Sequence, residues 1–351
     1  MEKKYQKLIG VGGIGSGLFF ALEGNQDLGR NESRAATLID ARDYCKLHIV
    51  THYLATLLAG ALHIVPLGSV GNDNTGLRLL EEMKAAHIDI SHIQISTSAP
   101  TLLSVCYQYP DGSGGNITAN NSASSQLEIQ DIDSIVSLFE EDAGHCIALV
   151  LPEAPLHLRD HLLRLATDFG ALRVAAFTSG EIAEARRTGL FERVDLLFLN
   201  EDEAEALTGY RLDPARPNSF LEKCALTLRA VQPEIQIVVT AGNHGAYGLS
   251  ADEWSHSPAC AVKVTNTAGA GDALIAGTLA GLISGLPLVE ESGEDRSIHT
   301  ALDFGVLLGS YSATSPHTIH PNAELKDLLS FARDAGKDVA FSLDETLSVS
   351  K

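Results

Sequence analysis

Short apolar runs alternate with helical segments along most of this chain. A largely apolar run predicts a strand that is buried on both faces, because a strand with one face in water alternates between apolar and polar residues. The predicted strands are residues 7–11, 62–67, 147–151, 173–177, 196–199 and 235–240, and helices are predicted at 50–59, 74–86 and 157–169. This pattern favours an α/β fold in which a mostly parallel central sheet is covered by helices on both faces.

The length and charge of the chain narrow its organisation and its partners. A length of 351 residues permits one large domain or two smaller ones, and we expect a single domain over residues 1–351. The net charge of −20 disfavours nucleic acid as a partner, because nucleic-acid binding relies on basic patches. We expect no membrane partner and no secretory signal, and hence a cytoplasmic location. The five cysteines are scattered without metal-binding spacing, which is typical of reduced core thiols.

A glycine turn at residues 266–272, with the sequence Asn-Thr-Ala-Gly-Ala-Gly-Asp, joins a predicted strand at 261–264 to a predicted helix. The first NH groups of a helix have no partner inside it, and with the helix dipole they form an anion site. A carboxylate at the same place would repel a phosphate, so we expect Asp272 to accept a proton instead. The turn therefore predicts phosphoryl transfer to a hydroxyl, with Asp272 as general base. The alternative is an ordinary turn in which Asp272 only caps the helix.

The turn resembles the second signature of the ribokinase-like (PfkB) carbohydrate kinases, Asp-Thr-x-Gly-Ala-Gly-Asp, with Asn266 in place of the first Asp. Segments 67–76, 200–209 and 238–246 are similar to three other parts of that family, in the same order, and the similarity spans roughly residues 60–315. The resemblance implies a ribokinase-like fold and ATP-dependent phosphorylation of a hydroxyl on a sugar or sugar-like small molecule. It also implies Mg²⁺ and leaves open a monovalent cation.

The resemblance assigns roles to individual residues. The catalytic residues that it implies are Asp272 and the backbone anion hole at Gly269, Ala270 and Gly271. The nucleotide-binding residues that it implies are Thr240, Gly242, Gly245, Thr267, Asn200 and Glu203, of which the last two would organise magnesium through water. As an alternative, Asn200 and Glu203 cap a helix over residues 201–208.

Residues 100–119 predict a hairpin with a turn-rich loop. In the resembled family this region and a segment after the first strand make a small β lid over the sugar. The lid candidates in this chain are residues 14–46 and 99–122. Closure would exclude water from the transfer site. Open edges of the lid strands favour a homodimer through the lid.

The residues expected to bind the phosphate acceptor depart from the family pattern. The family's first strand supplies an Asp where this chain has only Ser16, and residues 45–53 lack the Gly-Gly and Asn that usually follow. The substrate-binding candidates are therefore Ser16, His48, His52 and Asn116. His48 and His52 also have the spacing of a metal pair, with ordinary packing as the alternative. Arg30, Asn31 and Arg34 either lie in a solvated loop or meet an acidic or phosphorylated acceptor.

Two rival functions remain. Residues 10–15 have the GxGxxG spacing of a dinucleotide-binding turn, which favours an NAD-dependent dehydrogenase, but no second strand with a terminal acidic residue follows at the expected distance. Asn266 and the altered acceptor pattern favour a pseudokinase or ligand sensor that binds without turnover. The kinase is the main hypothesis.

Overall fold

The computed structural model describes residues 4–111, 113–290 and 298–339. Within these residues a large sheet has the strand order β13-β12-β11-β10-β9-β8-β1-β4-β5. Its strands are β1 (Lys7–Val11), β4 (His63–Gly71), β5 (Ile93–Ser96), β8 (Cys146–Val150), β9 (Leu172–Ala176), β10 (Leu196–Leu199), β11 (Gln236–Thr240), β12 (Ala246–Ser250) and β13 (Glu253–Ser257). The strands from β11 to β5 are parallel, and β12 and β13 add an antiparallel edge. The predicted mostly parallel α/β sheet is confirmed.

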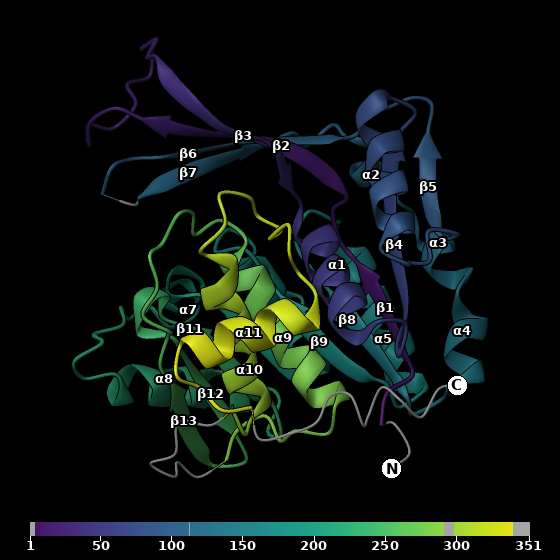
Figure 1. The fold of residues 1–351 in the computed structure, drawn as a ribbon. Coiled ribbons are helices and arrows are strands. Elements are labelled where there is room, and N and C mark those ends of the chain that lie inside the picture. The colour runs from purple at the N-terminus through teal and green to yellow at the C-terminus, as the bar shows by residue number, and fades with distance from the viewer. Residues whose placement is uncertain (1–3, 112, 291–297, 340–351) are drawn as a thin grey trace.

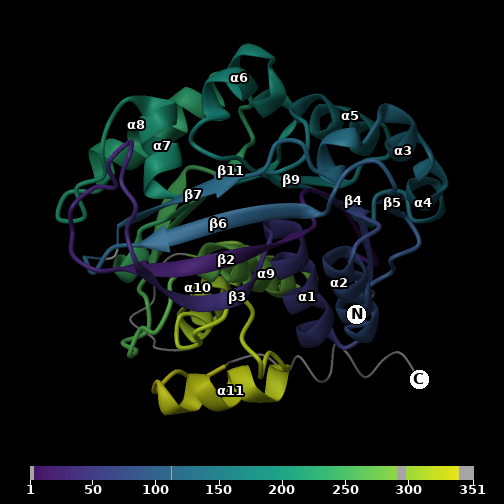
Figure 2. The same ribbon diagram turned by 90° about the horizontal axis from the view of Figure 1, so that it is seen from above.

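Helices cover both faces of this sheet, as Figure 2 shows from above. One layer contains α1 (Lys46–Leu58), α2 (Asn74–Ala85), α9 (Ala270–Ile283), α10 (Ala301–Ser312) and α11 (Leu325–Asp334). The other contains α3 (Ile129–Asp133), α4 (Val136–Glu141), α5 (Leu156–Asp168), α6 (Ile182–Arg187), α7 (Glu201–Thr208) and α8 (Asn218–Arg229). Strand side chains alternate between the faces, so Leu8 enters the first core and Ile9 the second. Short 3-10 turns lie at Ala123–Gln126 (η1), Leu190–Arg193 (η2) and Gly242–His244 (η3).

A second, smaller sheet lies above the large one in Figure 1. It consists of β2 (Gly15–Leu22), β3 (Ala36–Tyr44), β6 (Leu102–Gln108) and β7 (Gly114–Thr118), in the order β3-β2-β6-β7. These strands come from the two segments predicted as the lid, and β6 and β7 form the predicted hairpin.

The two faces of the small sheet differ in polarity. Opposite residues on neighbouring strands point to the same face of a sheet, so the strand register shows which side chains share a face. One face carries Asp43, Ser104 and Thr118, which are paired across the strands or through Gly17. The other face carries Leu18, Phe20, Leu38, Val105, Tyr107 and Ile117. The charge of Asp272 acts on Asp43, which places the polar face toward the large sheet and leaves the apolar face outside.

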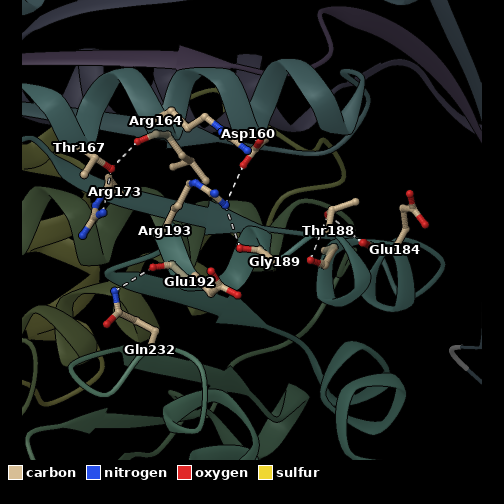
Figure 3. A network of polar contacts seen from close by, with 12 residues as sticks. Asp160, Arg164, Thr167, Arg173, Glu184, Thr188, Gly189, Glu192, Arg193 and Gln232 are labelled. Carbon is tan, nitrogen blue, oxygen red and sulfur yellow. Dashed lines mark hydrogen bonds and ion pairs between the residues drawn. The ribbon is translucent and has the colours of Figure 1, made fainter.

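Polar contacts tie the second helical layer to the strands beneath it (Figure 3). Arg193 forms an ion pair with Asp160 of α5 at 3.2 Å and donates to the carbonyl of Gly189 at 2.9 Å. Arg173 of β9 donates to the hydroxyl of Thr167 at the end of α5 at 2.9 Å. These contacts connect η2, α5 and β9.

Two local predictions need correction. Residues 261–264 are not a strand, because the segment pairs with no strand in the described parts of the chain. The next residues, Thr265 and Asn266, donate their NH groups to the carbonyl of Ala313. Its apolar side chains line a cavity, which gives the same sequence pattern as a strand. Residues 10–15 lead from β1 directly into β2 without a helix, so the GxGxxG run is not a dinucleotide-binding turn.

The five cysteines are free thiols, of which Cys45, Cys146 and Cys224 are buried as expected, whereas Cys106 and Cys260 are only partly buried. Among the described helices, none is both long and apolar enough to span a membrane.

Candidate active site

The chain reverses its direction of travel across the large sheet between β1 and β8. From β1 it proceeds to β4 and β5 on one side, and it returns to β8 on the other. Parallel sheets bind ligands at such a switch point, beyond the carboxyl ends of the strands. Glu153 follows β8 at this point and has a φ of 72°, which is rare for a residue other than glycine. A Cβ at Gly13 would lie 2.4 Å from the Cβ of Glu153, so Gly13 makes room for the carboxylate.

The amino ends of α1 and α9 meet beside the switch point. Asp272 lies in the first turn of α9 and is only 7% exposed. Lys46 is the first residue of α1, and its Nζ lies 3.3 Å from Oδ1 of Asp272. The Asp272 carboxylate raises the pKa of Lys46, so the ammonium stays charged. Burial raises the pKa of nearby Glu153 to about 7, although Lys46 opposes that effect.

The turn before α9 has the geometry of an anion site. Gly269 has a φ of 78°, and a Cβ there would lie 2.7 Å from the carbonyl oxygen of Thr318. The NH of Ala270 donates to the carbonyl of Thr267 at 3.2 Å. Within the described parts of the chain, the NH groups of Gly269 and Gly271 have no partner. The free donors are therefore at Gly269 and Gly271, whereas the NH of Ala270 is already engaged.

Asn266 holds this turn in place with both ends of its amide. Its Oδ1 accepts a hydrogen bond from the NH of Ala268 at 2.9 Å, and its Nδ2 donates to the carbonyl of Pro316 at 2.9 Å. A carboxylate could accept the first bond but could not donate the second. The residue that replaces the family's Asp therefore fits its surroundings as an amide.

A cavity of about 490 Å³ lies against the anion turn, between the turn after β11 and helix α10. The predicted nucleotide residues Thr240, Gly242, Gly245 and Thr267 line it. The predicted anion-hole residues Ala270 and Gly271 also line it, whereas Gly269 does not. Its other walls are apolar side chains from 259–264 and α10, which suits a flat heterocyclic base.

Asn200 and Glu203 form a reciprocal cap at the start of α7, as the alternative interpretation expected. The side chain of Asn200 accepts from the NH of Glu203, and that of Glu203 accepts from the NH of Asn200, both at 2.8 Å. Burial raises the pKa of Glu203 to about 7, and the charges of Lys46 and Asp272 also act on it. Glu203 therefore faces the same site. In the described residues, no group of three His, Cys, Asp or Glu side chains is arranged to hold a metal ion.

A second cavity, of about 370 Å³, lies between the small sheet and the switch point. Lys46 and Glu153 line it from below, and the predicted acceptor residue Asn116 lines it from β7. Glu181 forms another wall and is paired with the fully buried Arg159. The remaining lining is mostly Ser, Thr and Asn, namely Thr118, Asn120, Ser122, Ser125 and Thr178. Such a lining suits a small polyhydroxylated molecule.

The other predicted acceptor residues lie elsewhere. Ser16 lines neither cavity and accepts a hydrogen bond from Arg78 of α2 at 3.0 Å. His48 and His52 are packed inside the layer of α1 with their ring centroids 6.0 Å apart, and they line neither cavity. The packing alternative thus describes both histidines, and none of these three residues enters the function proposed below.

Arg34 also lies away from the second cavity. It donates to Glu32 and to the carbonyls of Gln26 and Asp27, all in its own exposed loop. The solvated-loop interpretation fits Arg34 better than a contact with an acidic acceptor.

The sequence interpretation missed Lys46, Glu153 and Asp43. Glu153 carried a usable signal, because it is a carboxylate directly after a buried strand end. Lys46 and Asp43 carried none, since their positions follow from how β3 and α1 pack against α9. Burial raises the pKa of Asp43, and the thiol of Cys106 donates to its carboxylate at 3.2 Å.

Comparison with known proteins decides the family. A model of the pfkB family of carbohydrate kinases matches residues 50–325. The chain belongs to this family. The PfkB assignment confirms the predicted class of enzyme, a kinase with an alcohol acceptor, and it leaves the dehydrogenase hypothesis without support.

The relatives of this PfkB chain act on different acceptors according to their names. It is 24% identical over 279 residues to a probable fructokinase-7 of Arabidopsis thaliana, covering 76% of this chain and 78% of the relative. It is 26% identical over 280 residues to an adenosine kinase of Saccharomyces cerevisiae, covering 77% and 78%. A crystal structure of ribokinase from Cryptococcus neoformans in complex with ADP has a TM-score of 0.71 at 19% identity, covering 93% of this chain and 99% of that one. The ribokinase-like fold is thus confirmed, and the chain is a sugar or nucleoside kinase in the broad sense.

Proposed function

We propose that this chain transfers the γ-phosphoryl group of ATP to a hydroxyl of a sugar or sugar-like small molecule, with Asp272 as general base. The observation that carries the proposal is that Asp272 directly follows residues that line one cavity and pairs with a residue that lines the other. The anion turn that precedes it lines the 490 Å³ cavity, and its ion-pair partner Lys46 lines the 370 Å³ cavity. A hydroxyl in the second cavity would therefore be close both to the carboxylate of Asp272 and to the turn that binds the phosphates of the nucleotide.

The nucleotide would occupy the larger cavity, with its base against the apolar wall and its phosphates at the turn of Gly269 and Gly271. The related ribokinase structure that holds ADP supports this choice. Magnesium would neutralise phosphate charge when bound, and Asn200 and Glu203 would hold its water ligands. Their oxygen donors fit a hard cation that keeps several waters, although both residues also cap α7. The proposal assigns no residue to a monovalent cation.

The acceptor would lie in the smaller cavity under the small sheet, which we propose to be the lid. Glu153, Glu181 and Asn116 would bind its hydroxyl groups. In the mechanism, Asp272 accepts the proton of the attacking hydroxyl, and the free NH groups of the turn stabilise charge on the transferring group. The lid would exclude water, which limits hydrolysis of ATP.

We also propose a homodimer through the lid. The outer face of the small sheet is apolar, and Ile117 and Leu38 on it are 69% and 50% exposed. Exposed apolar patches of this kind mark protein interfaces. The five free thiols agree with a reducing compartment, so we propose that the enzyme works in the cytoplasm.

The test is a coupled assay for ADP, with ATP, Mg²⁺ and a panel of acceptors. The panel should contain D-fructose, D-ribose, 2-keto-3-deoxy-D-gluconate and adenosine. We expect ADP formation that depends on one of the sugar acceptors and exceeds the rate without acceptor by at least about tenfold. Binding of MgATP without turnover of any acceptor would favour the ligand sensor instead.

A further inference from the structure

We propose that Lys46 is a further catalytic residue, whose ammonium group leaves Asp272 and binds the phosphoryl group during transfer. This inference rests on the proposed function, because it concerns the same transfer step. It assigns a role to a residue that the sequence motifs do not mark.

The first support is the position of Lys46 in the site. Its ammonium lies 3.3 Å from the carboxylate of Asp272, and its side chain also lines the acceptor cavity. It is therefore at the junction between the proton acceptor and the place where the attacking oxygen would lie. A group at this junction is within reach of the phosphorus as it passes from donor to acceptor.

The second support is the shortage of positive charge. Among the described residues that line the two cavities, Lys46 is the only Lys or Arg. The backbone turn contributes two free NH groups, at Gly269 and Gly271. Phosphoryl transfer needs positive groups around the moving oxygens, and kinases usually place a Lys or Arg there. Of the residues that line these two cavities, only Lys46 has a cationic side chain that can meet that need.

The third support is the change of charge during the reaction. Before transfer, Lys46 neutralises the Asp272 carboxylate. The acceptor oxygen then forms a bond to the γ-phosphorus, the bond from that phosphorus to the β–γ bridging oxygen breaks, and the hydroxyl proton passes to Asp272. Asp272 becomes neutral and later releases the proton to water. At that moment the ammonium has lost the charge of Asp272, its hydrogen-bonded partner, and the phosphoryl group is a new anion that it can bind.

The surroundings of Lys46 also favour an exchange of partner. The carboxylates of Glu153 and Glu203 act on the same ammonium, and its side chain is 36% exposed. The ion pair with Asp272 is a single contact at the long end of the hydrogen-bond range. A flexible Lys held by one long contact can turn toward a new anion without rearrangement of the backbone.

The experiment measures binding of a phosphoryl mimic, so it does not require the acceptor to be known. Aluminium fluoride with MgADP imitates the transferring group, and the readout is the midpoint of thermal unfolding with MgADP alone and with MgADP plus aluminium fluoride. The variants are Lys46→Met, Lys46→Arg, Asp272→Asn and the double variant of Lys46→Met with Asp272→Asn. Lys223→Met, on the remote helix α8, is the matched control.

We expect aluminium fluoride to add a further rise in the midpoint for the wild type, Lys223→Met and Asp272→Asn. Lys46→Arg should keep part of this rise. Lys46→Met and the double variant should lose it while they keep the rise caused by MgADP. In the assay for ADP, Lys46→Met should lower kcat by about 10²–10³ with a much smaller change in KM for ATP.

The comparison of Asp272→Asn with the double variant separates a direct role from a positioning role. Loss of the fluoride-dependent rise in Asp272→Asn alone would mean that Lys46 acts only through Asp272, and that result would overturn the inference. A double variant that keeps the full rise, or a wild type that gains none above MgADP, would overturn it too. A wild type that MgADP does not stabilise would instead overturn the proposed nucleotide function.

Discussion

Nζ of Lys46 lies 3.3 Å from Oδ1 of Asp272, although the two residues are 226 positions apart in the sequence. Each residue lies in the first turn of its helix, and the two helices pack side by side against the same face of the sheet. Both helix dipoles therefore direct their positive ends to one point, where a carboxylate and an ammonium meet. Binding, proton removal and charge stabilisation can all be tested at this point.

Substitution of Asp272 by Asn should remove the proton acceptor and keep the shape of the site. We expect kcat to fall by about two to four powers of ten, with little loss of ATP affinity. Steady-state kinetics and titration with MgATP check this. The control is Asp252→Asn, whose side chain is 96% exposed in the turn between β12 and β13. An unchanged kcat in Asp272→Asn would exclude this residue as the base.

Substitution of Asn266 by Asp restores the family's residue and should nevertheless destabilise the chain. The new carboxylate would face the carbonyl oxygen of Pro316, to which the amide now donates, in a position that is only 4% exposed. We expect a loss of about 1–3 kcal/mol in the free energy of unfolding, measured in urea. Asn218→Asp, at the exposed start of α8, is the matched control. Greater stability of the Asn266→Asp variant would contradict the proposed fit of the amide.

Gly13→Ala should disturb the acceptor site through Glu153. The new Cβ would lie 2.4 Å from the Cβ of Glu153, so the carboxylate must move. We expect KM for the acceptor to rise by about tenfold or more, since small displacements in a site are costly. In Gly180→Ala, where the added Cβ meets no atom within 4 Å, KM should stay the same. Equal KM values in the two variants would refute the role of Glu153 in acceptor binding.

Acid should destabilise the chain through His48. Burial lowers the pKa of His48 to about 3 from an ordinary value of 6.5, so the unfolded chain takes up a proton first as the pH falls. The stability contributed by neutral His48 is complete above pH 6.5 and is lost between pH 6.5 and about 3. The difference in the free energy of unfolding between His48→Leu and wild type should therefore shift by about 2 kcal/mol in favour of the variant from pH 7.5 to pH 5. Urea unfolding at the two pH values measures this shift.

The comparison of wild type with His48→Leu removes the contribution of other titrating groups to the pH dependence of stability. Half-buried His52 also has a lowered pKa, while Glu153 and Glu203 have raised values, but all three remain in wild type and His48→Leu alike. His157→Leu, on the exposed side of α5, is the control for the loss of an imidazole. The same difference between wild type and His48→Leu at both pH values would count against a neutral, buried His48.

Ile117→Lys on the outer face of the lid should break the proposed homodimer. The side chain is 69% exposed, so the monomer should fold normally while the interface gains a buried charge. Sedimentation equilibrium should show a dimer for wild type and a monomer for the variant. Leu226→Lys changes an equally exposed residue of α8 and should leave the dimer intact. A monomeric wild type would remove the lid interface from the proposal.

The sequence was sufficient for those features that local pattern determines. The apolar strands from 7–11 to 235–240, the glycine turn and the carboxylate of Asp272 could all be located, because each depends on neighbouring residues. The strand predicted at residues 261–264 was wrong, because a run of apolar residues has the same sequence pattern whether its side chains lie in a sheet or line a cavity. Ser16 was a candidate for binding the acceptor, but the strand register, which the sequence does not show, directs its side chain to Arg78. Lys46 could not be found at all, because only the packing of α1 against α9 brings it to Asp272.

Strand β3 ends at Tyr44 and α1 begins at Lys46, so Cys45 alone separates the small sheet from the helix that carries the ammonium group. Because only one residue separates them, a movement of β3 is passed directly to the start of α1. Any tilt of the β3 end of that sheet over an incoming molecule must then shift the cation as well. Capture of the acceptor and alignment of the charge that serves it would be a single mechanical event, with no signal relayed through the rest of the protein.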